Sequence, residues 1–221
     1  MSAAPLSPPP LLGRLEWSSG LCETGARALV WMGGGAACDG DALPPSALLP
    51  RAARARALGR IAATMAVQLL DPESREITIL NDEQGRPYVG GDRCRSRPGP
   101  HVSIAHKQHV AAAVAGWTSC GIDLEPVECR SATFERTALA PSEQALEPCE
   151  DRDTWLTRLW TVKEAVAKAG GRGLQGRPRD FEVRPVKGHS YHFECLGFFV
   201  RTEIVDAAGR PHVVAWTAAG S

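Results

Sequence analysis

The sequence has no apolar run that approaches the roughly 20 residues of a membrane-spanning helix, which argues against an integral membrane protein. It also has no excess of charge, because 25 Lys and Arg residues balance 25 Asp and Glu residues. A balanced charge argues against bulk binding to nucleic acid or to a membrane surface. The first ten residues have neither a charged segment nor an apolar core, so we expect no secretory signal there.

The cysteine pattern is not that of a disulfide framework or a zinc knuckle. The seven cysteines are odd in number and irregularly spaced, and none forms a CxxC pair. We therefore expect a protein of the reducing cytoplasm. His106 and His109 form an HxxH, but no further ligand pattern lies near them. A phosphate contact or a surface position explains the two histidines better than zinc.

Hydrophobic periodicity and turn residues predict an α+β protein. Asp153 is the expected N-cap of a helix that Gly170 and Gly171 end. Each half of the chain has one long helix and several strands, which predicts two α+β lobes, 15–104 and 105–221, after a disordered lead-in over 1–14. We predict long helices over 47–70 and 154–169, short helices over 132–139 and 142–148, a hairpin of strands 110–117 and 121–127, and strands over 26–32, 77–80, 86–89, 101–104, 180–184, 191–196, 198–205 and 212–217.

The segment Gly121-Ile122-Asp123-Leu124-Glu125 places two carboxylates on one face of a strand. Side chains alternate along a strand, so Ile122 and Leu124 point into a core while Asp123 and Glu125 point the other way. Two neighbouring acids repel unless a cation lies between them, and oxygen ligands favour Mg²⁺ or Mn²⁺. An edge strand with solvated acids explains this segment equally well.

A second segment, 160–168, places Glu164 and Lys168 on one side of a helix, with Trp160 one turn before. Taken alone, an ordinary surface Glu–Lys pair is the better explanation. The two segments lie about forty residues apart, and a metal-assisted phosphoryl transfer needs acids and a lysine of this kind together. Their conjunction therefore favours such a site.

These two segments together resemble the Sfp-like 4′-phosphopantetheinyl transferases, in which a GIDLE-type strand precedes a WTxKEA-type helix. Three weaker motifs of the family also occur in order: 85–87 (GRP), 102–106 (VSIAH) and 171–174 (GRGL). The resemblance covers roughly residues 15–216. It implies two similar lobes related by a pseudo-twofold axis, each a small antiparallel sheet packed on a long helix, with coenzyme A in the cleft between them.

The resemblance also implies a reaction and its site. The family transfers the phosphopantetheine arm of coenzyme A to a serine of an apo acyl or peptidyl carrier protein, releasing 3′,5′-ADP. Asp123, Glu125 and Glu164 would hold Mg²⁺, for which Mn²⁺ can substitute. Glu164 would deprotonate the serine, and Lys168 would bind the phosphates and stabilise the leaving group.

Nucleotide contacts are implied for a further set of basic residues. Arg86 and His106 would grip the 3′-phosphate and adenine end, and Lys163 would contact phosphate or brace the helix. One arginine of the segment 51–60 is expected to join them; Arg56 is our choice, with Arg51, Arg54 and Arg60 as rivals. The chain departs from the family at Ala105, where Ser is usual, and at Lys107, where Ser or Thr is common.

The partners implied are coenzyme A and carrier proteins that dock at the cleft edge and at 132–148, with the enzyme a monomer. The Pro-, Gly-, Arg- and Ala-rich composition is typical of high-GC bacteria, which points to polyketide or nonribosomal peptide biosynthesis. Two alternatives stay open: a non-catalytic coenzyme A scaffold, and a metal-dependent phosphotransferase for a small acceptor. A nucleic-acid binder is less favoured, because no aromatic-basic stripe occurs.

Overall fold

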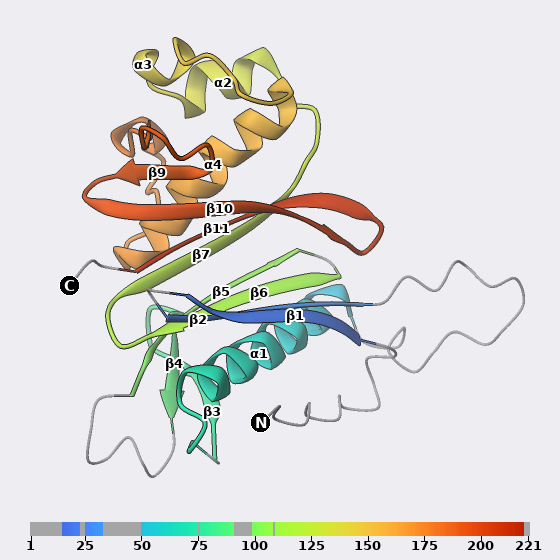
Figure 1. Cartoon of the computed structure of the whole chain (residues 1–221). Helices are drawn as coiled ribbons and strands as arrows, with labels where there is room; N and C mark the ends of the chain where they lie inside the picture. The colour runs from blue at the N-terminus through green and yellow to red at the C-terminus, as the bar shows by residue number, and fades with distance from the viewer. Residues whose placement is uncertain are drawn as a thin grey trace, which may run out of the picture.

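The computed structural model describes residues 15–22, 25–32, 50–74, 76–90, 99–107 and 109–218, with the backbone alone for 15–22, 30–32, 51 and 218. Two antiparallel sheets and their helices form an α+β fold, as predicted (Figure 1). No helix in these ranges is long and apolar enough to span a membrane. The disordered lead-in predicted for 1–14 lies outside the described residues.

The first sheet has six strands in the order β1-β2-β6-β5-β4-β3, and one face is covered by α1 (Arg51–Leu70). The small side chains of β6 let the helix lie close: Leu58 and Val67 of α1 are fully buried against Ala111 and Ala113. The strands are β1 (Leu15–Cys22), β2 (Gly25–Met32), β3 (Thr78–Asn81), β4 (Pro87–Gly90), β5 (His101–Lys107) and β6 (Val110–Gly116).

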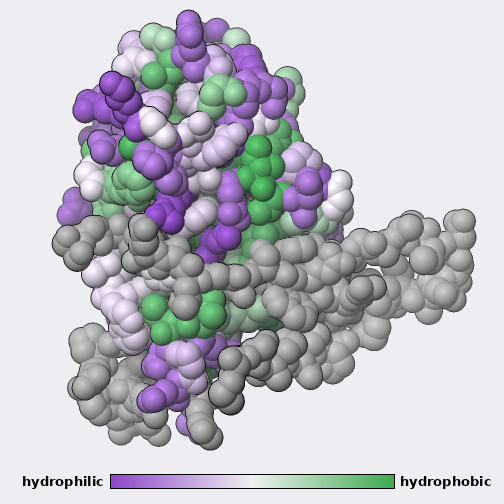
Figure 2. All heavy atoms as spheres, viewed as in Figure 1, coloured by the Kyte–Doolittle hydropathy of each residue, from purple (hydrophilic) through white to green (hydrophobic). Residues whose placement is uncertain are grey.

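The second sheet has five strands in the order β7-β11-β10-β9-β8, and α4 (Arg152–Ala169) covers its outer face. Leu159 and Val162 of α4 pack on Phe193 and Val200 of the sheet. The strands are β7 (Cys120–Pro126), β8 (Arg184–Pro185), β9 (His192–Cys195), β10 (Phe198–Ala207) and β11 (Arg210–Ala218). The short helices α2 (Ala132–Ala138) and α3 (Pro141–Gln144) precede α4, and Figure 2 shows mainly hydrophilic residues around them.

The two sheets pack face to face, so the molecule has four layers: α1, first sheet, second sheet and α4 (Figure 1). Leu29 and Val114 of the first sheet meet Ile122, Leu124 and Trp216 of the second. The chain changes sheet between β6 and β7. The predicted division into lobes after residue 104 falls within β5 and stays a prediction.

Two local predictions were wrong. The segments 110–117 and 121–127 do not form a hairpin, because β6 pairs with β2 and β5 while β7 pairs with β11. Both strands are buried along their whole length, which a position between two packed layers requires. The N-cap of α4 is Asp151, whose side chain accepts a hydrogen bond from the Thr154 backbone at 3.0 Å, and Asp153 lies in the first turn.

Other element boundaries also differ from the predictions. The helix predicted over 142–148 ends at Gln144. The strand predicted over 180–184 is replaced by a 3-10 turn, Pro178–Asp180, and the short β8. No strand was predicted over residues 15–22, which form β1. Its pairing partner β2 lies next to it along the chain, so the two strands form the first hairpin.

Candidate functional site

Asp123 of β7 and Lys168 of α4 form an ion pair at the C-terminal end of the helix, with Lys168 Nζ 2.7 Å from Asp123 Oδ1. The predicted alternation of β7 is confirmed, because Ile122 and Leu124 pack on the first sheet. Asp123 is paired with Ala215, which faces α4. Although β7 is an edge strand, Asp123 is only 4% exposed, which excludes the alternative of freely solvated acids.

Gly121 explains how the helix comes so near the strand. A Cβ atom at this position would lie 2.0 Å from the Ala165 carbonyl oxygen and 2.6 Å from the Ala169 backbone nitrogen. No side chain fits there. The glycine of the GIDLE segment is therefore what lets α4 approach β7 closely enough for Lys168 to reach Asp123.

Glu125, two residues further along β7, is buried and bound by cations from two other segments. Lys107 Nζ of β5 lies 2.8 Å from Glu125 Oε1, and Arg130 Nη2 lies 3.8 Å from Oε2. Burial and the neighbouring charge of Asp123 raise the pKa of Glu125, against the lowering effect of Lys107. The carboxylate thus sits in an environment that favours an added positive charge.

Glu164 faces the same two acids from α4. Burial raises the pKa of Glu164, the charges of Asp123 and, to a smaller extent, Glu125 add to that effect, and Lys168 opposes it. Glu164 is therefore near enough to both acids to repel them electrostatically. A half-buried carboxylic acid with a raised pKa is suited to accept a proton near neutral pH.

The three acids fit a divalent cation by their chemistry. Asp123 Oδ2 is buried and has no hydrogen-bond partner among the described residues, and oxygen-only donors suit Mg²⁺ or Mn²⁺. In the described part of the chain, no three His, Cys, Asp or Glu side chains already form a metal-binding group. Two of the acids are paired with lysines: Lys107 with Glu125 and Lys168 with Asp123.

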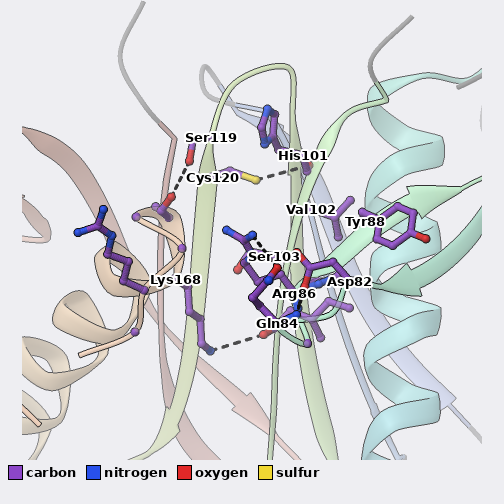
Figure 3. Close-up of a pocket in the computed structure, with 18 of the residues that line it drawn as sticks. Asp82, Gln84, Arg86, Tyr88, His101, Val102, Ser103, Ser119, Cys120 and Lys168 are labelled. Carbon is purple, nitrogen blue, oxygen red and sulfur yellow. Dashed lines mark hydrogen bonds and ion pairs between the residues drawn. The ribbon is translucent and has the colours of Figure 1, made fainter. Parts of the chain in front are cut away.

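A cavity of about 1180 Å³ opens beside Lys168, between β4 and β5 on one side and the end of α4 on the other (Figure 3). Ser119 anchors the helix end at its rim by donating a hydrogen bond to the Ala169 carbonyl at 2.6 Å. The side chain of Lys168 points toward β5, where its Nζ is 3.5 Å from the Ile104 carbonyl oxygen. The lining also includes Asp82, Gln84, Arg86, Tyr88, His101, Ser103, Gly171, Arg172 and Gln175.

Arg86 lies at the mouth of this cavity and is half-exposed. Its Nε donates to Asp82 at 2.9 Å and its Nη2 to Gln84 at 3.2 Å. Gly171, which has a φ of 71°, leaves room for the guanidinium, because a Cβ there would lie 2.9 Å from Arg86 Nη1. The GRP and GRGL motifs, distant in sequence, therefore meet at this mouth.

His106 lies on β5 among several cations. Burial and the charge of Lys168 lower the pKa of His106, with smaller contributions from Lys107 and Arg56. Arg56 is exposed on α1, and this electrostatic effect places it near the histidine. Such a cluster of positive charge is suited to bind an anion.

The other arginines of α1 give less evidence for a nucleotide contact than Arg56 does. Arg54 is partly buried, with no hydrogen-bond partner for its Nε among the described residues. Arg60 is exposed. The side chain of Arg51 lies outside the described residues.

Lys163 is not part of this group. Its ammonium is fully buried and donates to Glu143 Oε2 at 2.7 Å and to the Pro178 carbonyl at 2.9 Å. Glu143 also accepts from the backbone N–H groups of Ala140 at 2.6 Å and Val183 at 2.8 Å. This placement favours the alternative in which Lys163 braces the helix.

Comparison with known proteins bears on the family that the chain resembles. Residues 119–216 match the 4′-phosphopantetheinyl transferase superfamily. Over these residues the match confirms the family resemblance. The matched region contains the three acids, Lys163 and Lys168, whereas Arg56, Arg86, His106 and Lys107 precede it.

Two curated relatives are named phosphopantetheinyl transferases. An L-aminoadipate-semialdehyde dehydrogenase-phosphopantetheinyl transferase of Schizosaccharomyces pombe is 28% identical over 137 residues, which cover 52% of this chain and 50% of the relative. A 4′-phosphopantetheinyl transferase of Bacillus subtilis is 28% identical over 141 residues, 62% of this chain and 55% of the relative. The chain thus spans about half the length of these curated relatives.

Some contacts of the candidate site were not expected from the sequence. Ser103 Oγ accepts a hydrogen bond from the Ile122 backbone at 3.2 Å and joins the two sheets beside the acids. Glu143 had no assigned role, although its position three residues after Ala140 is that of a capping glutamate. The Lys107–Glu125 pair links strands of different sheets, and no local spacing reveals such a contact.

Proposed function

We propose that this protein transfers the 4′-phosphopantetheine arm of coenzyme A to a serine of an apo acyl or peptidyl carrier protein, with release of 3′,5′-ADP. The observation that carries the proposal is the ion pair of Asp123 with Lys168 at 2.7 Å, because Lys168 also lines the cavity. It joins the two motifs that the superfamily resemblance rests on, next to a space large enough for a nucleotide-sized substrate.

Coenzyme A is anionic at its phosphates, and the cations of the site match that charge. Lys168 and Arg86 line the cavity. The charges of Lys168 and of Arg56 on α1 both act on His106 of β5. In this proposal Lys168 binds the pyrophosphate, while Arg86, His106 and Arg56 hold the 3′-phosphate and adenine end. Lys163 is left out of substrate binding because its ammonium is already saturated by Glu143 and Pro178.

The transfer is a substitution at the phosphorus that carries the pantetheine arm. The serine oxygen forms a bond to this phosphorus, and the bond from the phosphorus to the bridging oxygen of the pyrophosphate breaks. Glu164 takes the proton of the serine, directly or through a water, and its raised pKa suits that task. The bridging oxygen leaves with the electron pair as part of 3′,5′-ADP, and Lys168 stabilises its charge.

Asp123, Glu125 and Glu164 are the residues that would hold Mg²⁺, or Mn²⁺ in its place. When bound, the ion neutralises the charge of the pyrophosphate. We expect EDTA to stop the transfer and either ion to restore it. Activity that survives chelation would remove the metal from the proposal.

We also propose where the enzyme acts, its oligomeric state and the carriers that it serves. We assign the enzyme to the cytoplasm as a monomer, and its carriers to polyketide or nonribosomal peptide synthesis. The carrier would dock at the cleft edge and on the segment 132–148, which holds α2 and α3 and is mostly exposed.

Intact-mass spectrometry tests the proposal. Apo carrier proteins are incubated with this protein, coenzyme A and Mg²⁺, beside carriers whose acceptor serine is replaced by alanine. We expect a gain of about 340 Da, the mass of one phosphopantetheine arm, on the serine carriers alone. Coenzyme A binding with no mass gain on several apo carriers would contradict transfer and favour a coenzyme A scaffold.

A further inference from the structure

Two lysines hold the buried acids of the candidate metal site. Lys168 pairs with Asp123, and Lys107 pairs with Glu125 across the two sheets at 2.8 Å. The second oxygen of Asp123 is buried, with no partner in the described part of the chain. The site thus combines one open carboxylate oxygen with a second carboxylate that already has a cation beside it.

The two members of the Lys107–Glu125 pair differ in their freedom to leave it. The Lys107 side chain is 40% exposed, whereas that of Glu125 is 10% exposed. A lysine ammonium on a flexible stem can move into water, but a buried carboxylate on a strand stays in place. A metal ion that bound Glu125 through Oε1 would therefore have to displace Lys107, because the carboxylate cannot move away.

We propose that Lys107 is a resident counter-ion of Glu125 that a divalent cation must displace, so that this lysine sets the metal affinity of the site. The inference rests on the part of the proposed function that gives the three acids a metal. Arg130, at 3.8 Å from Glu125 and largely buried, is the more distant and less mobile neighbour.

The test measures Mn²⁺ binding to the full chain by electron paramagnetic resonance of the free ion, with no coenzyme A and no carrier present. Lys107→Gln keeps the length of the side chain and removes its charge. We expect this variant to bind Mn²⁺ about tenfold more tightly than the wild type. The effect is smaller than for a fully buried lysine, because water screens the charge of Lys107. Lys107→Arg keeps the charge and is expected to bind like the wild type.

A second pair of variants tests whether the effect passes through Glu125. In a Glu125→Gln background, Lys107→Gln is expected to change Mn²⁺ affinity less than twofold, because the pair no longer exists. Thermal unfolding of each variant checks that it is folded. An unchanged or weaker affinity of Lys107→Gln, or no Mn²⁺ binding by any form, would overturn the proposal.

The outcome is independent of catalysis. If the carrier gains no mass while Lys107→Gln still tightens Mn²⁺ binding, the proposed transfer fails and the counter-ion role stands. If Lys107→Gln leaves Mn²⁺ binding unchanged and weakens coenzyme A binding, Lys107 is a phosphate contact and the counter-ion role is wrong.

Discussion

Helix α4 carries two lysine–carboxylate pairs, five residues apart, that have opposite characters. Lys163 and Glu143 are both 0% exposed, and both oxygens of Glu143 are hydrogen-bonded. Lys168 is 31% exposed and lines the cavity, whereas Asp123 is 6% exposed and its buried Oδ2 has no hydrogen-bond partner among the described residues. Ion pairs of the same chemistry therefore differ in how far they are satisfied: in the closed pair, Lys163–Glu143, both carboxylate oxygens are hydrogen-bonded, whereas the open pair, Lys168–Asp123, keeps one carboxylate oxygen without a partner.

The first prediction concerns the open pair. Lys168→Ala removes the cation that faces the leaving group, and we expect the transfer rate to fall by about 100- to 1000-fold. Asp123→Ala and Glu164→Ala are expected to be equally damaging. Transfer rates from intact mass and thermal unfolding are measured together. Near-normal turnover in any of the three would remove the role given to that residue.

The second prediction concerns the closed pair. Lys163→Met leaves a buried, unpaired Glu143, and we expect a loss of about 3–5 kcal/mol in the free energy of unfolding. The double variant Lys163→Met/Glu143→Gln is expected to recover part of this loss, because no charge remains buried. Urea unfolding measures both. A Lys163→Met protein with wild-type stability and no transfer activity would place Lys163 in the catalytic site instead.

The third prediction concerns a substitution that separates the open pair by moving α4 away from β7. Gly121→Ala places a Cβ against the Ala165 carbonyl and forces α4 away from β7. We expect a loss of about 1–3 kcal/mol in stability and a large loss of transfer. Gly170→Ala is the matched control, since its Cβ would lie 3.5 Å from the nearest atom. Equal effects of the two substitutions would contradict the close-approach argument.

The fourth prediction uses the raised pKa of Glu164. A carboxyl group whose pKa is higher in the folded state contributes most stability below its unfolded pKa, and this contribution is lost as the pH rises through the folded value. In EDTA at pH 7.5, Glu164→Gln should therefore be more stable than the wild type, by less than about 1 kcal/mol because the group is half-exposed. Near pH 4 the difference should vanish. If the wild type is instead more stable than Glu164→Gln at neutral pH, the pKa of Glu164 is not raised in the folded state.

The smallest expected effect is a change in thiol reactivity beside the closed pair. Burial raises the pKa of Cys195 to about 12, and Lys163 opposes this shift. We expect Cys195 to resist alkylation in the native protein while the exposed Cys129 and Cys149 react. Lys163→Met should increase labelling of Cys195 through local opening, as peptide mass mapping would show. Rapid labelling of Cys195 in the wild type would mean that this region is open.

The placement of site residues within a single strand or helix could be predicted from the sequence, because it depends only on the periodicity of that element. Alternation in β7 placed Asp123 and Glu125 on the face opposite Ile122 and Leu124, and helical spacing placed Glu164 and Lys168 on one side of α4. Lys163, one residue before Glu164, is turned by about 100° from it, and this rotation points it toward Glu143.

The contacts between layers did not follow from the sequence. β6 and β7 are consecutive strands joined by a short connection, a pattern that a hairpin and a change of sheet both satisfy. The Lys107–Glu125 pair and the meeting of Arg86 with Gly171 depend on how the sheets stack. Such contacts join residues far apart in the chain, so no local pattern encodes them.

The most direct test of the central claim is the ratio of the two products. Released 3′,5′-ADP is quantified by chromatography in the same reactions in which the carrier is weighed by intact mass. The account predicts one 3′,5′-ADP for each phosphopantetheine arm gained, and neither product with Lys168→Ala. Release of 3′,5′-ADP without a gain in carrier mass, or a gain in mass without 3′,5′-ADP, would contradict it.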